Sequence, residues 1–259
     1  MGAGKNMSKE KVIAVAGKGG TGKTTFTALL LRYLTKKHKD KAILAVDADS
    51  NANLNEALGL EIEETISMAL DDIKDPRLVP SGMTKNLFME MRISQAMVES
   101  DQIDLLVMGN PEGPGCYCYP NDLLRKYLEQ LRVNYDFVAV DNEAGMEHLS
   151  RRIINNIDYT FITSDATARG VRSAGRAYNI IKSLKINSGK VFLIITKTQN
   201  QEVSTLRGEI EKTELELLGT VPADDLVIEY DLNDKALFGL PDDSPAVQAV
   251  EEIAQKLQL

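Results

Sequence analysis

Residues 11–25 of the chain read Lys-Val-Ile-Ala-Val-Ala-Gly-Lys-Gly-Gly-Thr-Gly-Lys-Thr-Thr. The first part, 11–16, is a short apolar run that predicts a buried parallel strand. Residues 17–24 fit the pattern G-x-x-x-x-G-K-[ST] and lead into a helix predicted over 23–37. In that setting, glycine N–H groups and a helix N-terminus can surround phosphate groups. The stretch therefore predicts an α/β fold that carries a phosphate-binding loop (P-loop).

Working outward, apolar runs continue to alternate with stretches of helical spacing. The further predicted strands are 42–46, 104–108, 137–140, 159–163, 191–195 and 217–221. The further predicted helices include 121–132, 170–184 and 244–258. This alternation predicts a mostly parallel sheet of about seven strands with helices on both faces. Ligands of such sheets bind at the carboxyl ends of the strands.

Composition narrows the class of protein. The 259 residues carry a formal net charge of −8 and contain no Trp, which disfavours a nucleic-acid-binding surface. No apolar run approaches the roughly 20 residues of a membrane span, which disfavours a membrane partner. The two cysteines are too few for a disulfide scaffold. We therefore expect a soluble cytoplasmic protein.

Within the loop, each residue type has a chemical reason to be present. Lys23 is expected to reach the β- and γ-phosphates, and the Thr24 hydroxyl to bind Mg²⁺ directly. Thr25 is placed for the α-phosphate. The full set of expected nucleotide contacts from this stretch is Gly17, Lys18, Gly19, Gly20, Thr21, Gly22, Lys23, Thr24 and Thr25.

A second lysine makes the loop more specific. The string Lys-Gly-Gly-Thr-Gly-Lys-Thr, residues 18–24, resembles the deviant Walker A motif of the family that includes ParA, MinD, nitrogenase iron protein and the arsenite-pump ATPase. The resemblance implies an ATPase whose subunits form a homodimer around nucleotide. It also implies that Lys18 reaches the partner's phosphates and contributes to hydrolysis together with Lys23.

Residues 1–10 are polar, and no linker divides the rest of the chain. We expect a flexible N-terminal segment, 1–10, followed by a P-loop ATPase domain, 11–259. Residues 61–103 have little strand character, and we interpret them as a helical insertion. This insertion forms a surface for a partner or, more simply, its methionines fill the core. Its methionines include Met68, Met83, Met89 and Met91.

Carboxylates follow two of the predicted strands. Asp47 and Asp49 end the run 42–46, and a carboxylate beside the P-loop can orient the attacking water. The family's D-x-D pattern implies that Asp49 positions water and Asp47 joins the Mg²⁺ shell through water. Asp141 completes a Walker B pattern and is expected to hold Mg²⁺ through water. By resemblance, Gly145 belongs to a switch that senses the γ-phosphate. Helix or turn capping is the simpler alternative for these residues.

The base-binding part of the site is less regular. Relatives often have Asn-Lys after the sixth strand, and this chain has Thr196-Lys197 there. By resemblance we expect Thr196 and Lys197 to contribute to nucleotide binding, although Thr196 replaces the usual Asn. Pro222 lies in a stretch that resembles the loop packing on adenine. ATP is favoured over GTP because the N-K-x-D signature of GTPases is absent.

The two cysteines, Cys116 and Cys118, flank one tyrosine in a loop rich in proline and glycine. One such pair supplies two thiolates, while a closed Ni²⁺ or Zn²⁺ site needs about four ligands. A symmetric dimer would bring two pairs together, so we expect a dimer-bridging metal site. Unliganded or redox-active thiols are the alternative.

The cysteine pair also narrows the resemblance. Gly-Cys-Tyr-Cys, followed by Asp-Asn-Glu-Ala-Gly-Met-Glu-His-Leu at 141–149, is similar to the CooC-type ATPases. That similarity implies a maturation factor that holds nickel and delivers it to a client enzyme, carbon monoxide dehydrogenase or acetyl-CoA synthase. His148 is more simply a surface or core residue than a metal ligand.

Two other function classes stay open. One is an iron–sulfur-carrying, reductase-like ATPase that resembles nitrogenase iron protein. The other is a positioning ATPase of the MinD/ParA type. Arginines that could contact DNA in the second case are Arg151, Arg152, Arg169, Arg172 and Arg176, while the acidic tail 246–259 argues against a lipid surface.

Overall fold

The computed structural model describes residues 10–110, 118–142, 156–183, 188–199 and 202–259, with the side chains of 118–124 and 202 left out. Its centre is a seven-stranded sheet in the order β3-β2-β4-β1-β5-β6-β7. The strands are β1 (Lys11–Gly17), β2 (Ile43–Ala48), β3 (Ile103–Val107), β4 (Phe137–Asn142), β5 (Ile157–Asp165), β6 (Ser188–Thr198) and β7 (Glu216–Pro222). Every pairing between them is parallel, so all seven carboxyl ends lie along one edge. The predicted parallel sheet is confirmed.

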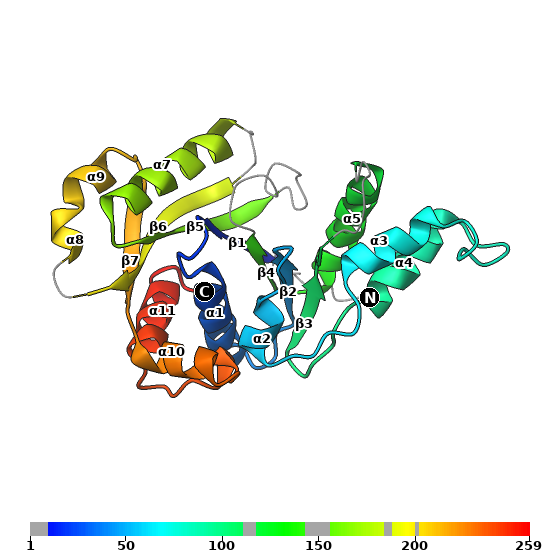
Figure 1. Cartoon of the computed structure of the whole chain (residues 1–259), viewed down its shortest axis with the longest axis horizontal. Helices are drawn as coiled ribbons and strands as arrows, with labels where there is room; N and C mark the ends of the chain where they lie inside the picture. Colours follow the sequence, from blue (N-terminus) through cyan, green and yellow to red (C-terminus); the bar gives the residue numbers. More distant parts are fainter. Residues whose placement is uncertain (1–9, 111–117, 143–155, 184–187, 200–201) are drawn as a thin grey trace, which may run out of the picture.

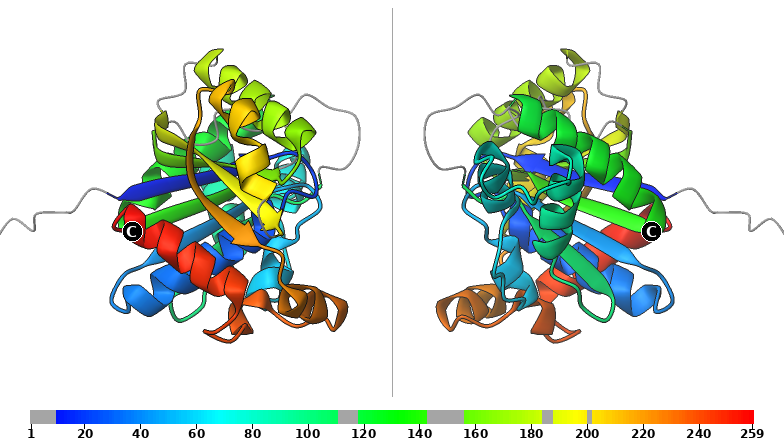
Figure 2. Two further views of the ribbon diagram at one scale, coloured as in Figure 1. Left: turned by 90° about the vertical axis from the view of Figure 1, so that its left-hand side faces the viewer. Right: turned by 90° about the vertical axis from the view of Figure 1, so that its right-hand side faces the viewer.

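Helices cover both faces of the sheet (Figures 1 and 2). One face carries α1 (Lys23–Lys37), α2 (Leu54–Leu58), α10 (Asp225–Leu232), η2 (Leu237–Gly239) and α11 (Pro245–Lys256). The other carries α3 (Ile66–Lys74), α4 (Lys85–Gln95), α5 (Cys118–Leu131), α7 (Ala168–Ser183), α8 (Glu202–Thr205) and α9 (Arg207–Glu211), and a short 3-10 turn, η1 (Arg132–Asn134), precedes β4. The predicted helices on both faces are therefore present.

The pattern of β1 shows why the sheet is buried on both sides. Alternate side chains of a strand point to opposite faces, and here both sets are apolar. Val12 and Ala14 join the core under α7, whereas Ile13 and Val15 join the core under α1 and α11. A strand with this composition needs helices on both faces, which is the arrangement observed.

Two helices, α3 and α4, lie within the segment 61–103. Thr65 caps α3 by accepting a hydrogen bond from the Met68 N–H, and Thr84 caps α4 in the same way from the Leu87 N–H. The Arg92 side chain joins the two helices by pairing with Asp72 at 2.7 Å and with Glu64 at 3.0 Å.

The methionines of this segment fall into two groups. Met89 is 2% exposed and fills the core, and Met83 and Met91 are partly buried against it. Met68 is 50% exposed, so core filling does not explain this residue.

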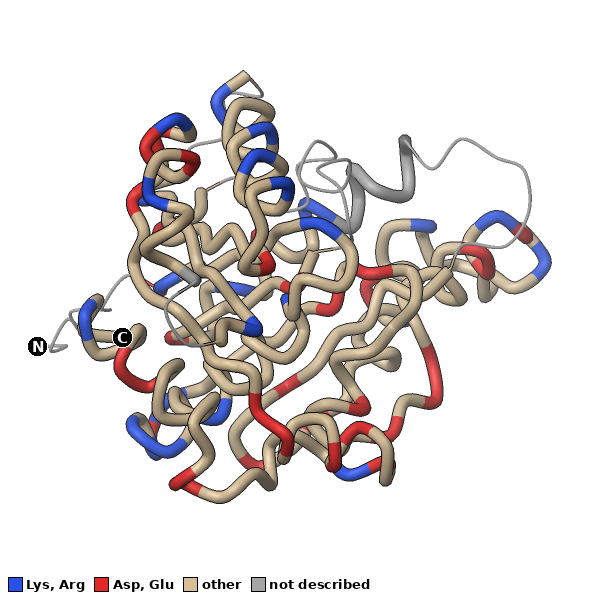
Figure 3. The backbone as a smooth tube through the Cα atoms, turned by 60° about the vertical axis from the view of Figure 1, so that its left-hand side comes forward, with Lys and Arg blue, Asp and Glu red and all other residues tan. Residues whose placement is uncertain are grey.

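Charge is distributed unevenly over the surface. Basic residues recur along α7 (Figure 3), where Arg169, Arg172 and Arg176 are all exposed. Arg172 pairs with Glu209 of α9 at 3.1 Å, which partly neutralises this face. Among the described helices, none has the length and apolar character needed to cross a membrane.

Candidate functional site

The glycine-rich loop lies at the carboxyl end of β1, between β4 and β5. Gly20 and Gly22 have φ values of +76° and +73°, in the left-handed region that favours glycine. At Gly17, an added Cβ would lie 2.5 Å from the Oγ1 atom of Thr163. Glycine is therefore required at this turn both by backbone conformation and by the close approach of β5.

Hydrogen bonds from neighbouring strands hold the loop in place. The Thr21 hydroxyl donates to the Lys18 carbonyl at 2.7 Å and lies 2.8 Å from the Thr163 hydroxyl. From the end of β6, the Thr196 hydroxyl donates to the Thr21 carbonyl at 2.7 Å, and the Lys197 ammonium donates to the Gly20 carbonyl at 2.9 Å. The loop is thus braced by side chains before any ligand is present.

These hydrogen bonds limit which other groups the side chains of Thr196 and Lys197 can contact. Thr196 is buried, and its single hydroxyl proton faces the carbonyls of Thr21 and Ser164. The hydroxyl of Thr196 is therefore hydrogen-bonded to the loop that would hold the phosphates. Lys197 is exposed except for its bond to the same loop, and its φ of +54° turns the chain there.

The two lysines of the loop have different surroundings. Lys18 is exposed, while Lys23, the first residue of α1, is only 7% exposed. Within the described residues, neither ammonium has a hydrogen bond or ion pair. An ammonium group that no side chain or backbone carbonyl engages is open to an anionic ligand at the end of the loop, so the position of Lys23 fits a bound phosphate.

Asp141 at the end of β4 is paired with α1. Thr24 donates a 2.6 Å hydrogen bond to its Oδ2, and Thr27 donates a longer bond, 3.4 Å, to its Oδ1. The carboxyl is 1% exposed. Burial and, to a smaller extent, the nearby charge of Asp47 together raise the pKa of Asp141 to about 7, against the opposing effect of the Thr24 hydrogen bond.

Asp47 lies opposite Asp141 in the β2–β4 register. Its carboxylate accepts hydrogen bonds from the N–H groups of Asp49 at 3.0 Å and Leu54 at 2.9 Å, which fixes the turn into α2. Burial raises the pKa of Asp47, and these hydrogen bonds partly offset that increase. Asp49 accepts two bonds from Asn51 on one carboxylate oxygen, Oδ1, and the structure records none on the other. Asp47 therefore supports the start of α2 through the Leu54 N–H, while Asn53 is the residue at the N-cap position.

The residues at this edge fit a magnesium nucleotide. A hydroxyl and several carboxylates are the hard oxygen ligands that Mg²⁺ prefers, and Thr24, Asp47 and Asp141 supply them. Thr25 is half-buried in the first turn of α1. Pro222 ends β7, two strands away from β5 in the sheet.

Three of the predicted site residues cannot be placed in full. Gly145 and Cys116 lie outside the described residues. Cys118 begins α5, but its side chain is not described. The metal site expected from the cysteine pair thus remains a prediction. Among all the described residues, no group of three or more His, Cys, Asp or Glu side chains could hold a metal ion.

The structure adds residues that the sequence patterns did not single out. Thr27 contacts Asp141, and Thr163 contacts the loop from β5. Asn142, which is buried next to Asp141, donates from its amide to the Val15 carbonyl at 2.9 Å and joins β4 to β1. Only the position of Asn142 directly after the Walker B carboxylate could have drawn attention to it, because a single Thr or Asn carries no spacing signal.

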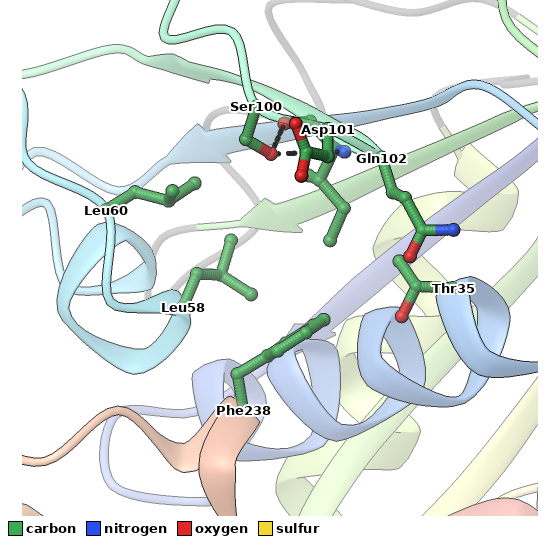
Figure 4. Close-up of a pocket in the computed structure, with 8 residues that line it drawn as sticks. Thr35, Leu58, Leu60, Ser100, Asp101, Gln102 and Phe238 are labelled. Carbon is green, nitrogen blue, oxygen red and sulfur yellow. Dashed lines mark hydrogen bonds between the residues drawn. The ribbon is translucent and has the colours of Figure 1, made fainter. Parts of the chain in front are cut away.

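A separate hollow of about 240 Å³ lies at the other end of the sheet. Leu58 of α2 and Phe238 of η2 face it (Figure 4), and Ile103, the first residue of β3, forms part of its wall. Because β3 begins here, whereas Asp47 and Asp141 lie at the carboxyl ends of their strands, this hollow is not part of the site described above.

Comparisons with known proteins agree with this geometry. A family model described as the CobQ/CobB/MinD/ParA nucleotide binding domain matches residues 12–238. An uncharacterized ATP-binding protein of Methanocaldococcus jannaschii is 39% identical over 249 residues, covering 95% of this chain and 98% of that protein. The carbon monoxide dehydrogenase accessory protein CooC of Rhodospirillum rubrum is 30% identical over 228 residues, covering 83% and 84%. The structure of the MinD cell division protein of Aquifex aeolicus matches with a TM-score of 0.70 at 24% identity, over 96% of both chains.

Proposed function

Because the chain belongs to the CobQ/CobB/MinD/ParA nucleotide-binding domain family, we propose that it is an ATP-hydrolysing maturation factor. In this proposal it forms a homodimer around ATP and Mg²⁺, holds nickel (or zinc) through Cys116 and Cys118, and delivers the metal to a client enzyme. The client is carbon monoxide dehydrogenase or acetyl-CoA synthase. Nickel is the cargo of this reaction, whereas ATP drives it.

The observation that carries the nucleotide part is the placement of Lys23, Thr24 and Asp141 together at the glycine-rich loop, with the Lys23 ammonium engaged in no hydrogen bond or ion pair among the described residues. In the proposal, Lys23 binds the β- and γ-phosphates, and Thr24 holds Mg²⁺ directly while Asp47 and Asp141 hold it through water. Bound Mg²⁺ neutralises charge that develops on the phosphates. Asp49 orients the attacking water with the carboxylate oxygen that Asn51 leaves free.

Two observations support the dimer. Lys18 is exposed at the tip of the loop and, among the described residues, has no side-chain partner of its own. This suits a residue that reaches the phosphates bound to a second subunit. Each chain has two cysteines, which is half of a four-thiolate site. Dimerisation would then complete the nucleotide site and the metal site in one step.

The cargo is supported by the relative named for carbon monoxide dehydrogenase and by the Cys-Tyr-Cys motif. Soft thiolate ligands bind nickel and zinc well. The proposed coupling is a population shift, in which ATP favours a dimer with high metal affinity and hydrolysis favours release.

The test is an anaerobic Ni²⁺ titration of the full chain, with and without a non-hydrolysable ATP analogue, together with light scattering to determine the oligomeric state. We expect one nickel ion per dimer and tighter binding with the analogue. Replacing both cysteines by serine abolishes this binding, while Tyr117→Phe, which keeps both thiols, leaves it in place. Unchanged nickel binding in the double variant contradicts the proposed cargo site.

The same preparation separates the other function classes. Stoichiometric iron with acid-labile sulfide would favour a reductase-like carrier. Salt-dependent binding to DNA at micromolar protein would favour a positioning ATPase. To identify the client, the protein loaded with nickel and the ATP analogue is used in an anaerobic pull-down. We expect it to recover a nickel enzyme when both thiols are intact and not when they are replaced.

A further inference from the structure

The helix α10, which follows the last strand of the sheet, lies at the periphery of the molecule (Figures 1 and 2). Five of its eight residues are apolar, yet none of the eight is buried. Apolar side chains of a surface helix normally face the core. Ile228 and Leu232 are instead 56% and 77% exposed, and Leu232 is the most exposed large apolar side chain among the described residues.

The helical period separates α10 into two apolar sides. Leu226, Val227 and Tyr230 lie on one side, where they are partly buried against the core under α1 and α11. Ile228 and Leu232 are four residues apart, which places them one above the other on the opposite side. The core thus uses only the first side, and the second forms an apolar strip that faces outward.

Acidic residues surround this outward strip. Asp225, Glu229 and Asp231 are all exposed, and the helical period places Asp225 one turn before Ile228 and the other two on either side of the strip. Glu229 and Asp231 lie in the last turn, where the helix dipole disfavours negative charge and no basic residue is present. These acids therefore do not stabilise the end of the helix that carries them. The α10 face is defined here as Asp225, Ile228, Glu229, Asp231 and Leu232.

The surroundings of the α10 face are also acidic. Residues 224–256 contain nine Asp or Glu residues and two Lys residues, in a chain whose total formal net charge is −8. One of these lysines, Lys235, lies 3.7 Å from Glu229, and both side chains are more than half exposed, so this pair is weak. A surface that complements the α10 face must therefore be positively charged.

The start of α10 is held in place by Asp224, which is 8% exposed. Its carboxylate accepts hydrogen bonds from the Leu226 N–H at 2.9 Å and from the Ser244 hydroxyl at 2.6 Å. It also accepts from the Ala246 N–H at 3.1 Å, at the start of α11. Because α10 is fixed to α11 before any partner binds, little conformational entropy is lost when its outward side is covered.

We propose that the α10 face is a docking surface for a partner protein that presents a positively charged amphipathic helix. Ile228 and Leu232 are the apolar anchors of this contact, and the surrounding acids pair with Lys or Arg of the partner. The surface itself is independent of nucleotide and metal binding. The identification of this partner with the client enzyme rests on the proposed function.

The charge of the α10 face argues against other occupants. Anionic lipid and nucleic acid are both repelled by a cluster of carboxylates. A symmetric contact between the α10 faces of two copies of this chain places the same acids opposite one another, which is unfavourable. A basic protein surface is the occupant that satisfies both the apolar strip and its acidic border.

The first experiment uses a synthetic peptide of about 18 residues, with Leu along one side of the helix and Lys and Arg on the other. Its control is a scrambled peptide of the same composition, which keeps the charge and loses the apolar side. Fluorescence anisotropy measures binding to the full chain. We expect a Kd of about 10 μM for the amphipathic peptide and affinity at least about tenfold weaker for the scrambled one.

Substitutions then locate the binding surface. We expect Ile228→Gln and Leu232→Gln each to weaken binding of the amphipathic peptide about tenfold. Glutamine preserves helix propensity and both positions are exposed, so the thermal unfolding midpoint is expected to stay at the wild-type value. The matched control is Ile180→Gln at a 42% exposed position of α7, which leaves peptide binding unchanged.

A second pair of variants tests the charges. Asp225→Asn combined with Asp231→Asn is expected to weaken peptide binding and to reduce its dependence on salt. Asp40→Asn combined with Glu56→Gln removes the same charge at two other exposed positions and leaves binding close to the wild-type value.

Three results overturn the docking surface. They are equal affinity for the two peptides, wild-type peptide affinity in both glutamine variants of α10, and self-association of the free chain that Leu232→Gln abolishes. The last result, measured by light scattering, assigns the α10 face to a second copy of this chain.

The same variants are then tested against purified, metal-free carbon monoxide dehydrogenase and acetyl-CoA synthase. We expect the wild type to bind one of these enzymes and Leu232→Gln to bind it about tenfold more weakly. If peptide binding depends on the α10 face but neither enzyme binds, the docking surface is supported and the proposed client is wrong. If an enzyme binds Leu232→Gln as tightly as the wild type, the proposed client is supported and its assignment to the α10 face is wrong.

Discussion

The hydroxyl of Thr24 donates a 2.6 Å hydrogen bond to Oδ2 of Asp141, across the gap between the first turn of α1 and the end of β4. Both groups are proposed to take part in binding Mg²⁺. Without the metal they satisfy one another, and the carboxyl is buried with its pKa raised to about 7. In the proposed site, Thr24 would bind Mg²⁺ through a lone pair of its oxygen and keep its hydrogen bond to Asp141, whereas any proton that Asp141 holds must leave when the metal binds.

The first prediction concerns pH. The folded-state pKa of Asp141 is about 7, above the unfolded value of about 3.9. Mg²⁺ binds the carboxylate, so we expect Mg-ATP affinity to fall as the pH drops below 7 and proton release on binding near pH 7. Titration calorimetry in two buffers of different ionisation enthalpy measures this release. Asp141→Asn has no proton to lose, so binding that still releases the same number of protons in this variant contradicts the assignment.

The same residue predicts a change in the stability of the metal-free protein. Because folding raises the pKa of Asp141, its contribution to stability is complete below about pH 4 and is lost as the pH rises through about 7. Urea unfolding of the metal-free chain between pH 5 and pH 8 is the measurement. We expect Asp141→Asn to be less sensitive to pH than the wild type over this range, and equal sensitivity counts against the raised pKa.

We expect substitutions of the two loop lysines to affect different steps, nucleotide binding for Lys23 and dimerisation with hydrolysis for Lys18. Lys23→Ala removes a charged partner of the phosphates, and we expect a loss of ATP affinity of about 10- to 100-fold. Lys18→Ala retains binding by the single chain but loses the nucleotide-dependent dimer and about 10³-fold in hydrolysis rate. The measurements are calorimetry, light scattering and phosphate release. Lys39→Ala, at an exposed lysine beyond the end of α1, is the control. Wild-type hydrolysis by Lys18→Ala contradicts the role across the dimer.

The fold was predictable because its strands are apolar runs between glycine turns. The observed strands extend beyond the predicted ones where polar residues continue the ladder. For example, β4 includes Asp141 and Asn142, and β6 runs from Ser188 to Thr198. A rule based on hydrophobicity ends a strand at the first polar residue, whereas hydrogen bonding between backbones does not depend on the side chain. The antiparallel bridge between Val98 and Leu105 could not be predicted for a different reason, since it is an isolated pair and a single residue carries no strand pattern.

The candidate site was predictable where a motif has fixed spacing and unpredictable where contacts are long-range. Lys23, Thr24 and Asp141 follow from local patterns that place them at one edge of the sheet. The link from Asp224 to Ser244 spans 20 residues. Each end has a local signal, since Asp224 follows Pro222 before an apolar run and Ser244 precedes Pro245, as helix-capping residues do. No spacing rule predicts that the two caps share one hydrogen bond.

Gly109 supports a prediction about the end of β3, where the chain leads toward the cysteine pair. Its φ is +69°, and an added Cβ would lie 2.5 Å from the Thr65 Oγ1 atom. Gly82 has a similar φ, +87°, but no atom within 4 Å of an added Cβ. We expect Gly82→Ala to cost about 1–2 kcal/mol from backbone strain alone. Gly109→Ala adds overpacking, about 1–3 kcal/mol more. Chemical unfolding measures both, and equal losses contradict the close packing of α3 on β3.

Thr160 and Thr163 of β5 give the last prediction, because they differ mainly in hydrogen bonding. Both are 1% exposed. The Thr160 hydroxyl has no hydrogen-bond partner among the described residues, whereas that of Thr163 bonds to the Ala16 carbonyl at 3.3 Å and to the Thr21 hydroxyl at 2.8 Å. Valine has nearly the shape of threonine without the hydroxyl. We therefore expect Thr160→Val to raise the free energy of unfolding by about 1 kcal/mol and Thr163→Val to lower it by about the same amount.

Urea unfolding monitored by circular dichroism measures both variants under the same conditions, and opposite shifts of the midpoint are the expected result. Thr163→Val also removes a support of the P-loop, so we expect it to weaken ATP binding. Thr160→Val is expected to leave ATP binding unchanged, because the neighbours of Thr160 in the sheet, Ala14 and Val191, lie away from the loop. A destabilised Thr160→Val would mean that its hydroxyl has a partner in solution, such as a buried water, and that the cost of an unsatisfied group does not apply at this position.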